Sequence, residues 1–312
     1  MNNRLSDDEI RAKAAPLRRG AVALFAGGIV FVVATVVLFL IFFVSAGSGI
    51  ANMSYMPGLA ENVPFFIFFI LLVPGVILLV LGGVCQSKMR NIICESLVLE
   101  ALLEGFTDVS YDPKASIDKA LIKSVKLVDN WQQFKGKDHF LGLYKGRKVE
   151  FSDLTLSHEV SSGESSHTVI DFKGPWMICD FGKHIPTRLK IRERKGGNAV
   201  SGRKSSVETE NIAFNKQFQI LTDDPHSAFY ILTPHFMERI VRMDTAAHGQ
   251  TLLCFEGSRV HIAINSGREL FKVTGRKKEL EDFSGLRASF RQELFYITGI
   301  IDILCENDNL VR

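Results

Sequence analysis

The sequence predicts a membrane-anchored α+β protein, in which an N-terminal hairpin of two transmembrane helices precedes a mixed α+β cytoplasmic domain. Two observations lead to this prediction. The excess apolar character lies almost entirely between Ala21 and Val84. The rest of the chain interleaves apolar side chains with charges, in segments that alternate between a period of two and a helical period. We therefore expect a cytoplasmic basic arm over residues 1–20, the transmembrane hairpin over 21–84 and the α+β domain over 85–312.

Two apolar runs are long enough to cross a bilayer. The first covers residues 21–44, the second covers residues 65–84, and neither contains a charged residue. Because a helix rises about 1.5 Å per residue, about 20 residues span the roughly 30 Å hydrocarbon layer. Transporters and proton pumps usually place ionisable groups at membrane depth, so uncharged spans are typical of an anchor.

Flanking charges predict the orientation of the hairpin. Basic residues precede the first run and follow the second, whereas the connecting segment 45–64 has none. The positive-inside rule then places both termini in the cytoplasm and the connecting loop outside. We expect a multi-pass protein of the inner (cytoplasmic) membrane. A cleaved signal peptide is the competing interpretation of the first run, but that run is long and a second span follows it.

Helical periodicity predicts the helices of the cytoplasmic domain. We expect a helical stalk over 87–105, a short helix over 115–127, a helix that begins at Thr233-Pro234, and a C-terminal helix. Thr233 would cap its helix with the hydroxyl group, and Pro234 suits the first turn. The C-terminal helix carries one apolar stripe, formed by Leu286, Phe290, Leu294, Ile297, Ile301 and Leu304.

Alternating apolar and polar residues predict the strands. A hairpin over 138–156 should turn at Lys145-Gly146. Further strands are expected over 168–180, 185–194, 218–221 and 229–232, and a second hairpin over 252–264 around Glu256-Gly257-Ser258. Two segments rich in Gly and Ser, 161–167 and 195–206, are expected to be loops.

Composition and motifs restrict the functions that the sequence supports. The net charge of +3 is spread along the chain, so we expect no nucleic-acid partner. The five cysteines are widely spaced and form no C-x-x-C pair, which argues against a zinc site or a disulfide framework. None of the eight histidines stands at metal spacing with another His or Cys. We predict no catalytic residue, no metal site and no cofactor.

One strand has a distinctive pattern of charge. Arg188, Lys190, Arg192 and Arg194 occupy alternate positions, so their side chains should share one face of the strand. One interpretation is a solvated strand face or a protected sheet edge. The other is contact with anionic lipid headgroups or with a partner, for which these four residues are our candidates.

Several soluble segments resemble a bacterial family of two-span membrane proteins whose soluble domain has no assigned function. The residues that carry the resemblance are 142–146 (GLYKG), 149–154 (VEFSDL), 172–174 (FKG) with Asp180-Phe181 and Lys183, 214–218 (FNKQF) and 228–238 (AFYILTPHFME). The resemblance implies a location in the bacterial cytoplasmic membrane and supplies no activity. Members of this family are often encoded beside LemA-type membrane proteins, which implies a shared complex.

These observations favour a membrane-anchored cytoplasmic interaction or assembly module. Its expected partners are the lipid bilayer and a protein partner or further copies of the chain, with a LemA-type membrane protein as one candidate. An unrecognised membrane-associated enzyme or small-ligand sensor is the alternative, which a pocket of convergent polar groups would favour. A subunit of a channel or transporter is a third interpretation, against which the uncharged spans count.

Overall fold

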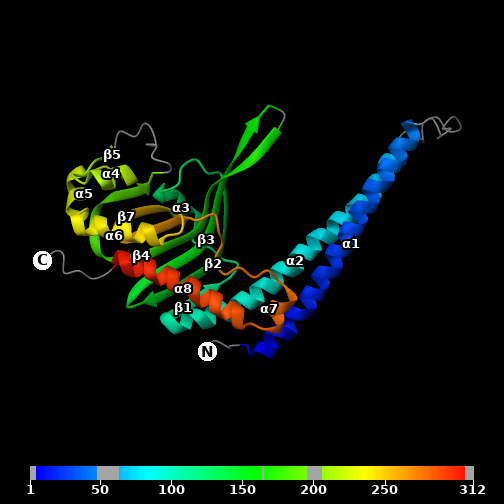
Figure 1. Ribbon diagram of the computed structural model, residues 1–312, viewed down its shortest axis with the longest axis horizontal. Coiled ribbons are helices and arrows are strands. Elements are labelled where there is room, and N and C mark those ends of the chain that lie inside the picture. Colours follow the sequence, from blue (N-terminus) through cyan, green and yellow to red (C-terminus); the bar gives the residue numbers. More distant parts are fainter. Residues whose placement is uncertain (1–4, 48–62, 164, 195–205, 306–312) are drawn as a thin grey trace. The chain divides into compact units, whose positions relative to one another are not determined.

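The computed structural model describes residues 5–47, 63–163, 165–194 and 206–305 of the chain. It confirms the predicted class at the level of secondary structure, because two long apolar helices precede an antiparallel sheet with further helices (Figure 1). The chain divides into two compact units. The first contains Met1–Ser96 and Val273–Phe283, and the second contains Leu97–Lys272 and Ser284–Arg312.

The first unit is built on α1 (Asp7–Gly47) and on α2 (Val63–Gly105) as far as Ser96. Both helices are long and apolar enough to cross a membrane. They pack closely at two glycines, because a Cβ atom at Gly28 would lie only 3.0 Å from the carbonyl oxygen of Gly75. Small residues are the usual means by which membrane helices bring their backbones together. Most of the predicted connecting loop, 45–64, lies outside the described residues.

A short returning segment completes the first unit. It contains α7 (Lys277–Glu281) and packs on the N-terminal part of α1. Arg11 of α1 donates from Nε to the carbonyl oxygen of Leu280 at 3.0 Å and from Nη2 to that of Glu281 at 2.9 Å. Its guanidinium also lies 5.5 Å from the ring centre of Phe283. The basic arm is therefore helical from Asp7 and is bound by a segment more than 250 residues away in sequence.

The last part of α2 belongs to the second unit. Leu97, Val98 and Leu102 are completely buried there. Two ion pairs join this part of α2 to α8 (Ser284–Cys305): Arg287 lies 3.1 Å from Glu100, and the Nε atom of Arg291 lies 2.9 Å from Glu104. One continuous helix thus contributes both to the apolar hairpin and to the core of the α+β unit.

Seven strands form one antiparallel sheet in the described residues. They are β1 (Thr107–Asp112), β2 (Gln133–Tyr144), β3 (Arg147–Ser162), β4 (Ser165–Glu193), β5 (Ser206–Val207), β6 (Phe218–Thr222) and β7 (Gln250–Asn265). The order is β1-β2-β3-β4-β6-β5, and β7 pairs with the other edge of β4. The long β4 is central, because its residues 176–179 lie between β3 and β7 and its residues 189–192 lie between β6 and β7.

Both faces of the sheet are covered. On one face, α3 (Lys119–Val125) and its flanks bury Ile117, Ile122 and Leu127 against Leu156, Trp176 and Cys254. The other face carries α6 (Pro234–Ala246) and α8, and Phe236 of α6 stacks edge-on against Phe255 of β7. The helices α4 (Ile212–Gln217) and α5 (Pro225–Ile231) connect β5, β6 and α6.

Several local predictions are confirmed. Lys145 and Gly146 both have positive φ angles, 49° and 78°, which a two-residue hairpin turn of the primed type requires. Thr233 caps α6 by accepting the amide of Phe236 at 3.3 Å. The short helix predicted over 115–127 is present as α3, but it covers only Lys119–Val125. Every residue of the predicted stripe on the C-terminal helix is buried.

Other local predictions are wrong. Residues 229–232 were expected to form a strand, but α5 extends to Ile231. The reason is a start signal like that of α6: Asp224 accepts the amide of His226 at 3.0 Å, and Pro225 occupies the first turn. Residues 161–167 were expected to be a loop, but β3 and β4 continue to a tight turn at Gly163.

Two strand boundaries are also corrected. Residues 168–180 and 185–194 were expected to be separate strands, yet β4 is continuous and has register shifts on either side of Ile185. The hairpin expected over 252–264 is the single strand β7. Gly257 has a positive φ of 59°, but it faces Ile185 in the bulged part of β4, so the glycine serves a bulge and not a turn. Residues 195–205 of the second predicted loop lie outside the described residues.

Candidate functional site

Three of the four predicted contact residues, Arg188, Lys190 and Arg192, share the α3 face of β4, and Arg194 follows the end of that strand. Lys190 is opposite Cys254 and Arg192 is opposite Leu252, and both of these partners point into the layer beneath α3. Their chain neighbours Leu189 and Ile191 are buried. Because side chains alternate along a strand, Leu189 and Ile191 lie on the opposite face, so the alternation expected from the sequence is present.

The cationic side chains bind their own fold. Arg188 donates to the carbonyl oxygen of Ser124 at 3.1 Å, and Lys190 donates to that of Lys126 at 2.9 Å. Arg188 also pairs with Glu256. Arg194 donates from Nε to the carbonyl oxygen of Asn215 at 3.0 Å. These contacts hold the C-terminal end of α3 and the C-terminal end of α4. Additional contact with lipid or a partner stays a prediction.

Arg192 is the most enclosed member of the four, with 7% of its surface exposed. Its Nη1 atom lies 2.7 Å from a carboxylate oxygen of Asp129, and its Nη2 atom donates to the carbonyl oxygen of Lys126 at 2.7 Å. Lys126 itself has a positive φ of 50°. A buried cation requires such partners, because removing a charge from water is costly. For Arg192 the interpretation as a solvated strand face is therefore wrong.

A small pocket lies beside Arg192, which we name the Arg192 pocket. It has a volume of about 150 Å³, and its polar lining includes Asp129, Asp171, Arg192, Glu193, Arg194 and Gln219. Burial raises the pKa of Glu193. The Nε atom of Arg192 is buried and has no hydrogen-bond partner among the described residues. The pocket is thus small, charged and able to offer both donors and acceptors.

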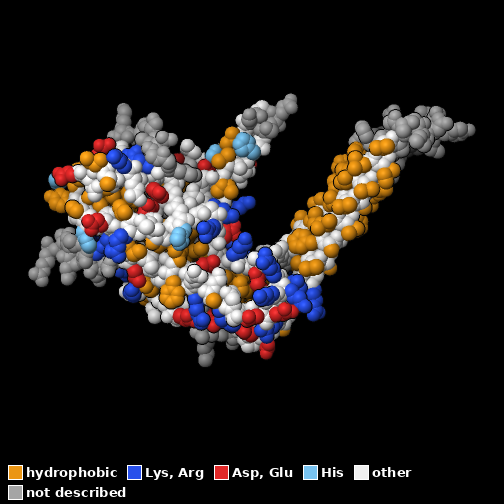
Figure 2. Space-filling model, viewed as in Figure 1, with side chains coloured by type: hydrophobic (Ala, Val, Ile, Leu, Met, Phe, Trp, Pro, Cys, Tyr) orange, Lys and Arg blue, Asp and Glu red, His pale blue; other side chains and the backbone are white. Residues whose placement is uncertain are grey.

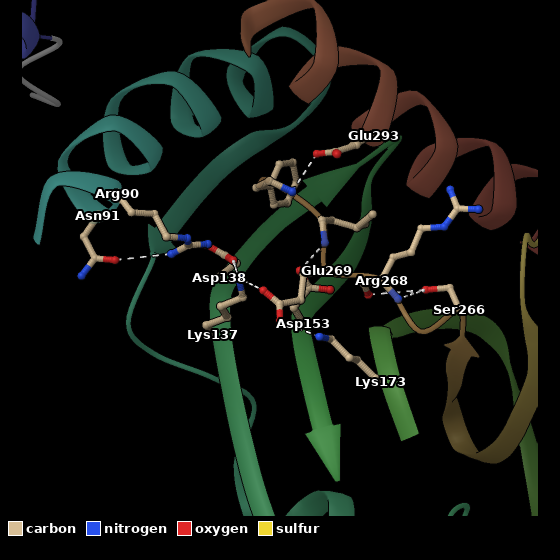
Figure 3. A network of polar contacts seen from close by, with 12 residues as sticks. Arg90, Asn91, Lys137, Asp138, Asp153, Lys173, Ser266, Arg268, Glu269 and Glu293 are labelled. Carbon is tan, nitrogen blue, oxygen red and sulfur yellow. Dashed lines mark hydrogen bonds and ion pairs between the residues drawn. The ribbon is translucent and has the colours of Figure 1, made fainter. Parts of the chain in front are cut away.

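A second group of polar side chains gathers on the α8 side of the sheet (Figure 3). We name it the carboxyl cluster, and its members are Asp138 of β2, Asp153 of β3, Glu269 in the segment after β7, and Glu293 of α8. Asp138 and Asp153 have 0% and 3% of their surface exposed. The side chain of Asp138 accepts the hydroxyl of Tyr111 at 2.8 Å.

The carboxyl cluster binds the chain just after β7. Asp153 accepts the amide of Leu270 at 2.7 Å, and Glu293 accepts the amide of Phe271 at 2.7 Å. Phe271 has a positive φ of 49°, which a bulky residue adopts only under constraint. Its ring packs against Phe151 and Phe290, with centroids 6.0 and 5.6 Å away. Two carboxyl groups and two rings therefore fix an unfavourable backbone conformation.

Burial perturbs the acidity of the cluster. It raises the pKa of Asp153 well above the ordinary value, and the neighbouring Asp138 acts in the same direction. Burial raises the pKa of Glu293 to about 7, again with a contribution from Asp138. By contrast, the pKa of Glu269 falls to about 2, because Lys137 and Lys173 donate to its carboxylate. Neighbouring acids with pKa values this far apart are characteristic of sites that hold or exchange protons.

Sequence reasoning missed the carboxyl cluster. One signal was available, because Asp153 stands between Phe151 and Leu154 in a strand that packs on both sides. The other acids come from β2, the segment after β7 and α8, and no sequence spacing joins them. In the described residues, no group of three or more His, Cys, Asp or Glu side chains has an arrangement that could hold a metal ion.

A family model matches the C-terminal part of the chain, from within β4 to the end of α8. Residues 170–305 match the model of a family described as "Protein of unknown function (DUF3137)". The resemblance to a family without an assigned function is thereby confirmed, while the association with LemA-type proteins stays a prediction. The matched region contains Glu269, Glu293 and the four predicted contact residues, whereas Asp138 and Asp153 precede it.

The chain was also compared with curated proteins and with solved structures. No curated protein matches the chain. A similar solved structure is the crystal structure of the mycobacterial trehalose monomycolate transport factor A, TtfA. Its TM-score is 0.36 at 10% sequence identity, and the match covers 65% of this chain and 95% of that one.

Proposed function

We propose that this protein is a membrane-anchored module that holds its α+β unit at the cytoplasmic face of the inner membrane, where that unit binds a protein partner or a further copy. The anchor is supported by the length and composition of α1 and α2. Their outer surfaces expose large apolar side chains, among them Val30, Ile41 and Ile70 with 67%, 60% and 67% of their surface exposed (Figure 2). Lipid is the solvent that stabilises such a surface.

One observation carries the proposal of an interaction module. β3 and β4 continue beyond their neighbours as a two-stranded arm, which we name the projecting ribbon (residues 158–162 and 165–169; Figure 1). The pairing of β2 with β3 ends at Ser157, and that of β7 with β4 ends at Trp176. Both outer edges of the ribbon are thus open in the described sheet. Unpaired strand edges are templates for the addition of another strand.

A cross-linking experiment tests the ribbon. A photoreactive amino acid at Ile170, which has 57% of its surface exposed at the ribbon's base, should give an adduct in intact membranes. Replacing residues 159–168 by Asn-Gly keeps His158 opposite Val169 and should abolish that adduct. The mass of the adduct distinguishes a partner from a second copy.

The matched control places the same photoreactive group at Phe295 on α8, with 75% of its surface exposed. An equal adduct at that control position, or an Ile170 adduct that survives removal of the ribbon, would exclude the ribbon as the interaction site. The proposal also requires that the protein stay in the membrane pellet after extraction with alkaline carbonate.

A small-ligand sensor is a second candidate, because the Arg192 pocket has the convergent polar groups that this alternative requires. Free amino acids and small dicarboxylates, at millimolar concentration, are suitable probes for a pocket of this size and charge. We expect at least one to raise the thermal midpoint of the full chain in detergent, and Arg194→Gln to remove that increase. If none of them changes the midpoint, this candidate function is wrong.

A further inference from the structure

A second pocket lies in the first unit, where the apolar run of α1 begins. We name it the basic pocket, and its volume is about 390 Å³. Its charged lining comes from α1 (Arg11, Arg18, Arg19) and from α7 (Lys277, Glu281). Ligand pockets typically have volumes of about 300 Å³ or more, so this one can hold a substantial chemical group.

The position of the basic pocket relative to the apolar surface is defined within α1 itself. Arg18 and Arg19 stand directly before the uncharged run that begins near Ala21. With a rise of about 1.5 Å per residue, their Cα atoms lie within one helical turn of that run. Figure 2 shows the apolar surface of the helices giving way to blue side chains at this end. In a membrane, this is the level of the lipid headgroups.

The walls of the basic pocket are held in place. Arg18 donates from Nε to the carbonyl oxygen of Gly275 at 3.1 Å, which uses one of the five N–H donors of its guanidinium. The backbone at Gly275 is itself bound, because Glu279 accepts the amide of Gly275 at 2.8 Å. Arg11 binds the carbonyl oxygens at the end of α7. The pocket is therefore formed by two segments that several hydrogen bonds join.

We propose that the basic pocket binds the phosphate group of an anionic phospholipid headgroup. Four cationic side chains line it, against the single carboxylate of Glu281, which lies 3.3 Å from Lys277. Arginine matches the geometry of phosphate oxygens, and a basic pocket at the cytoplasmic interface is the usual form of such a site. The inference deepens the proposed membrane anchorage and rests on it.

The experiment uses the full chain purified in a mild detergent. Phosphatidylglycerol, phosphatidylcholine and inorganic phosphate are titrated separately, and the thermal midpoint is measured at each concentration. We expect phosphatidylglycerol to raise the midpoint and the other two to have no effect. An equal increase with inorganic phosphate would overturn the assignment to a lipid, and so would an equal increase with phosphatidylcholine.

Two variants locate the effect. In the triple variant Arg18→Gln, Arg19→Gln and Lys277→Gln, the apparent affinity for phosphatidylglycerol should fall by at least about tenfold. In the control Arg188→Gln with Lys190→Gln, which removes charge from β4, the lipid should still raise the variant's own midpoint as in the wild type. A response lost only in the control would overturn the proposal and assign lipid contact to β4.

Failure of this inference can be distinguished from failure of the membrane anchor. The triple variant keeps both apolar runs, so it should stay in the carbonate-resistant membrane fraction while losing the lipid response. If the wild-type protein is itself extracted by carbonate, the anchorage is wrong, whatever the lipid titration shows.

Discussion

Glu293→Gln is expected to stabilise the second unit above neutral pH by up to about 3 kcal/mol. Burial raises the pKa of Glu293 from its ordinary value of 4.5 to about 7. Between those two pH values the folded protein therefore binds more protons at this site than the unfolded chain does. The stability that this site contributes is complete below pH 4.5, decreases as the pH rises to about 7, and stays low at higher pH.

A glutamine at position 293 removes this dependence on pH. Its side-chain oxygen can still accept the amide of Phe271, but it carries no charge that burial would penalise. The variant should exceed the wild type in stability at pH 8 and match it near pH 4. The pKa of Asp153 is also raised by burial, so this residue should add to the decrease in the wild-type protein's stability as the pH rises.

Urea unfolding of the full chain in detergent measures this difference. Both tryptophans, Trp131 and Trp176, belong to the second unit, so their fluorescence follows its unfolding. Glu238→Gln is the matched control, because the Glu238 side chain is 74% exposed, and this variant should differ little from the wild type in stability at pH 8. A wild-type stability that increases from pH 5 to pH 8, with Glu293→Gln less stable at pH 8, would contradict this account of the carboxyl cluster.

Arg192→Met should destabilise the second unit by about 2 kcal/mol. The substitution removes the ion pair with Asp129 and the donor to the carbonyl oxygen of Lys126. Loss of one partner from a fully buried pair costs about 3–5 kcal/mol, and the value here is smaller because the Asp129 side chain is 30% exposed. The segment after α3, with Lys126 in a left-handed conformation, should lose order as well.

A double-mutant cycle separates the ion pair from the packing of the long side chain. Asp129→Leu combined with Arg192→Met replaces both charged partners, and it should recover most of the lost stability, because no unpaired charge remains. Arg242→Met, at an exposed position of α6, is the control for the loss of an arginine and should change stability little. If Arg192→Met lowers the stability no more than this control does, the contacts of Arg192 contribute nothing measurable to the stability of the second unit.

Features whose causes lie within a few residues could be predicted from the sequence alone. The two apolar runs, the Lys145-Gly146 turn and the start of α6 at Thr233 follow from hydropathy, from backbone conformation and from capping. The stripe on α8 follows from the helical period in the same way. The same capping signal stands at Asp224-Pro225, but the apolar residues after it are equally typical of a strand, and the helix α5 was therefore not predicted.

Contacts between residues far apart in the sequence could be established only from the three-dimensional structure. Asp153 and Glu293 are 140 positions apart, and they come together because β3 and α8 both enclose the segment at Leu270 and Phe271. Arg192 contacts Asp129 across 63 positions, and Arg11 contacts Leu280 across 269 positions. Such contacts depend on the register of the sheet and on which face each helix covers. The pattern of residues along the chain predicts neither the register nor the covered face, because each residue's hydropathy is compatible with many partners.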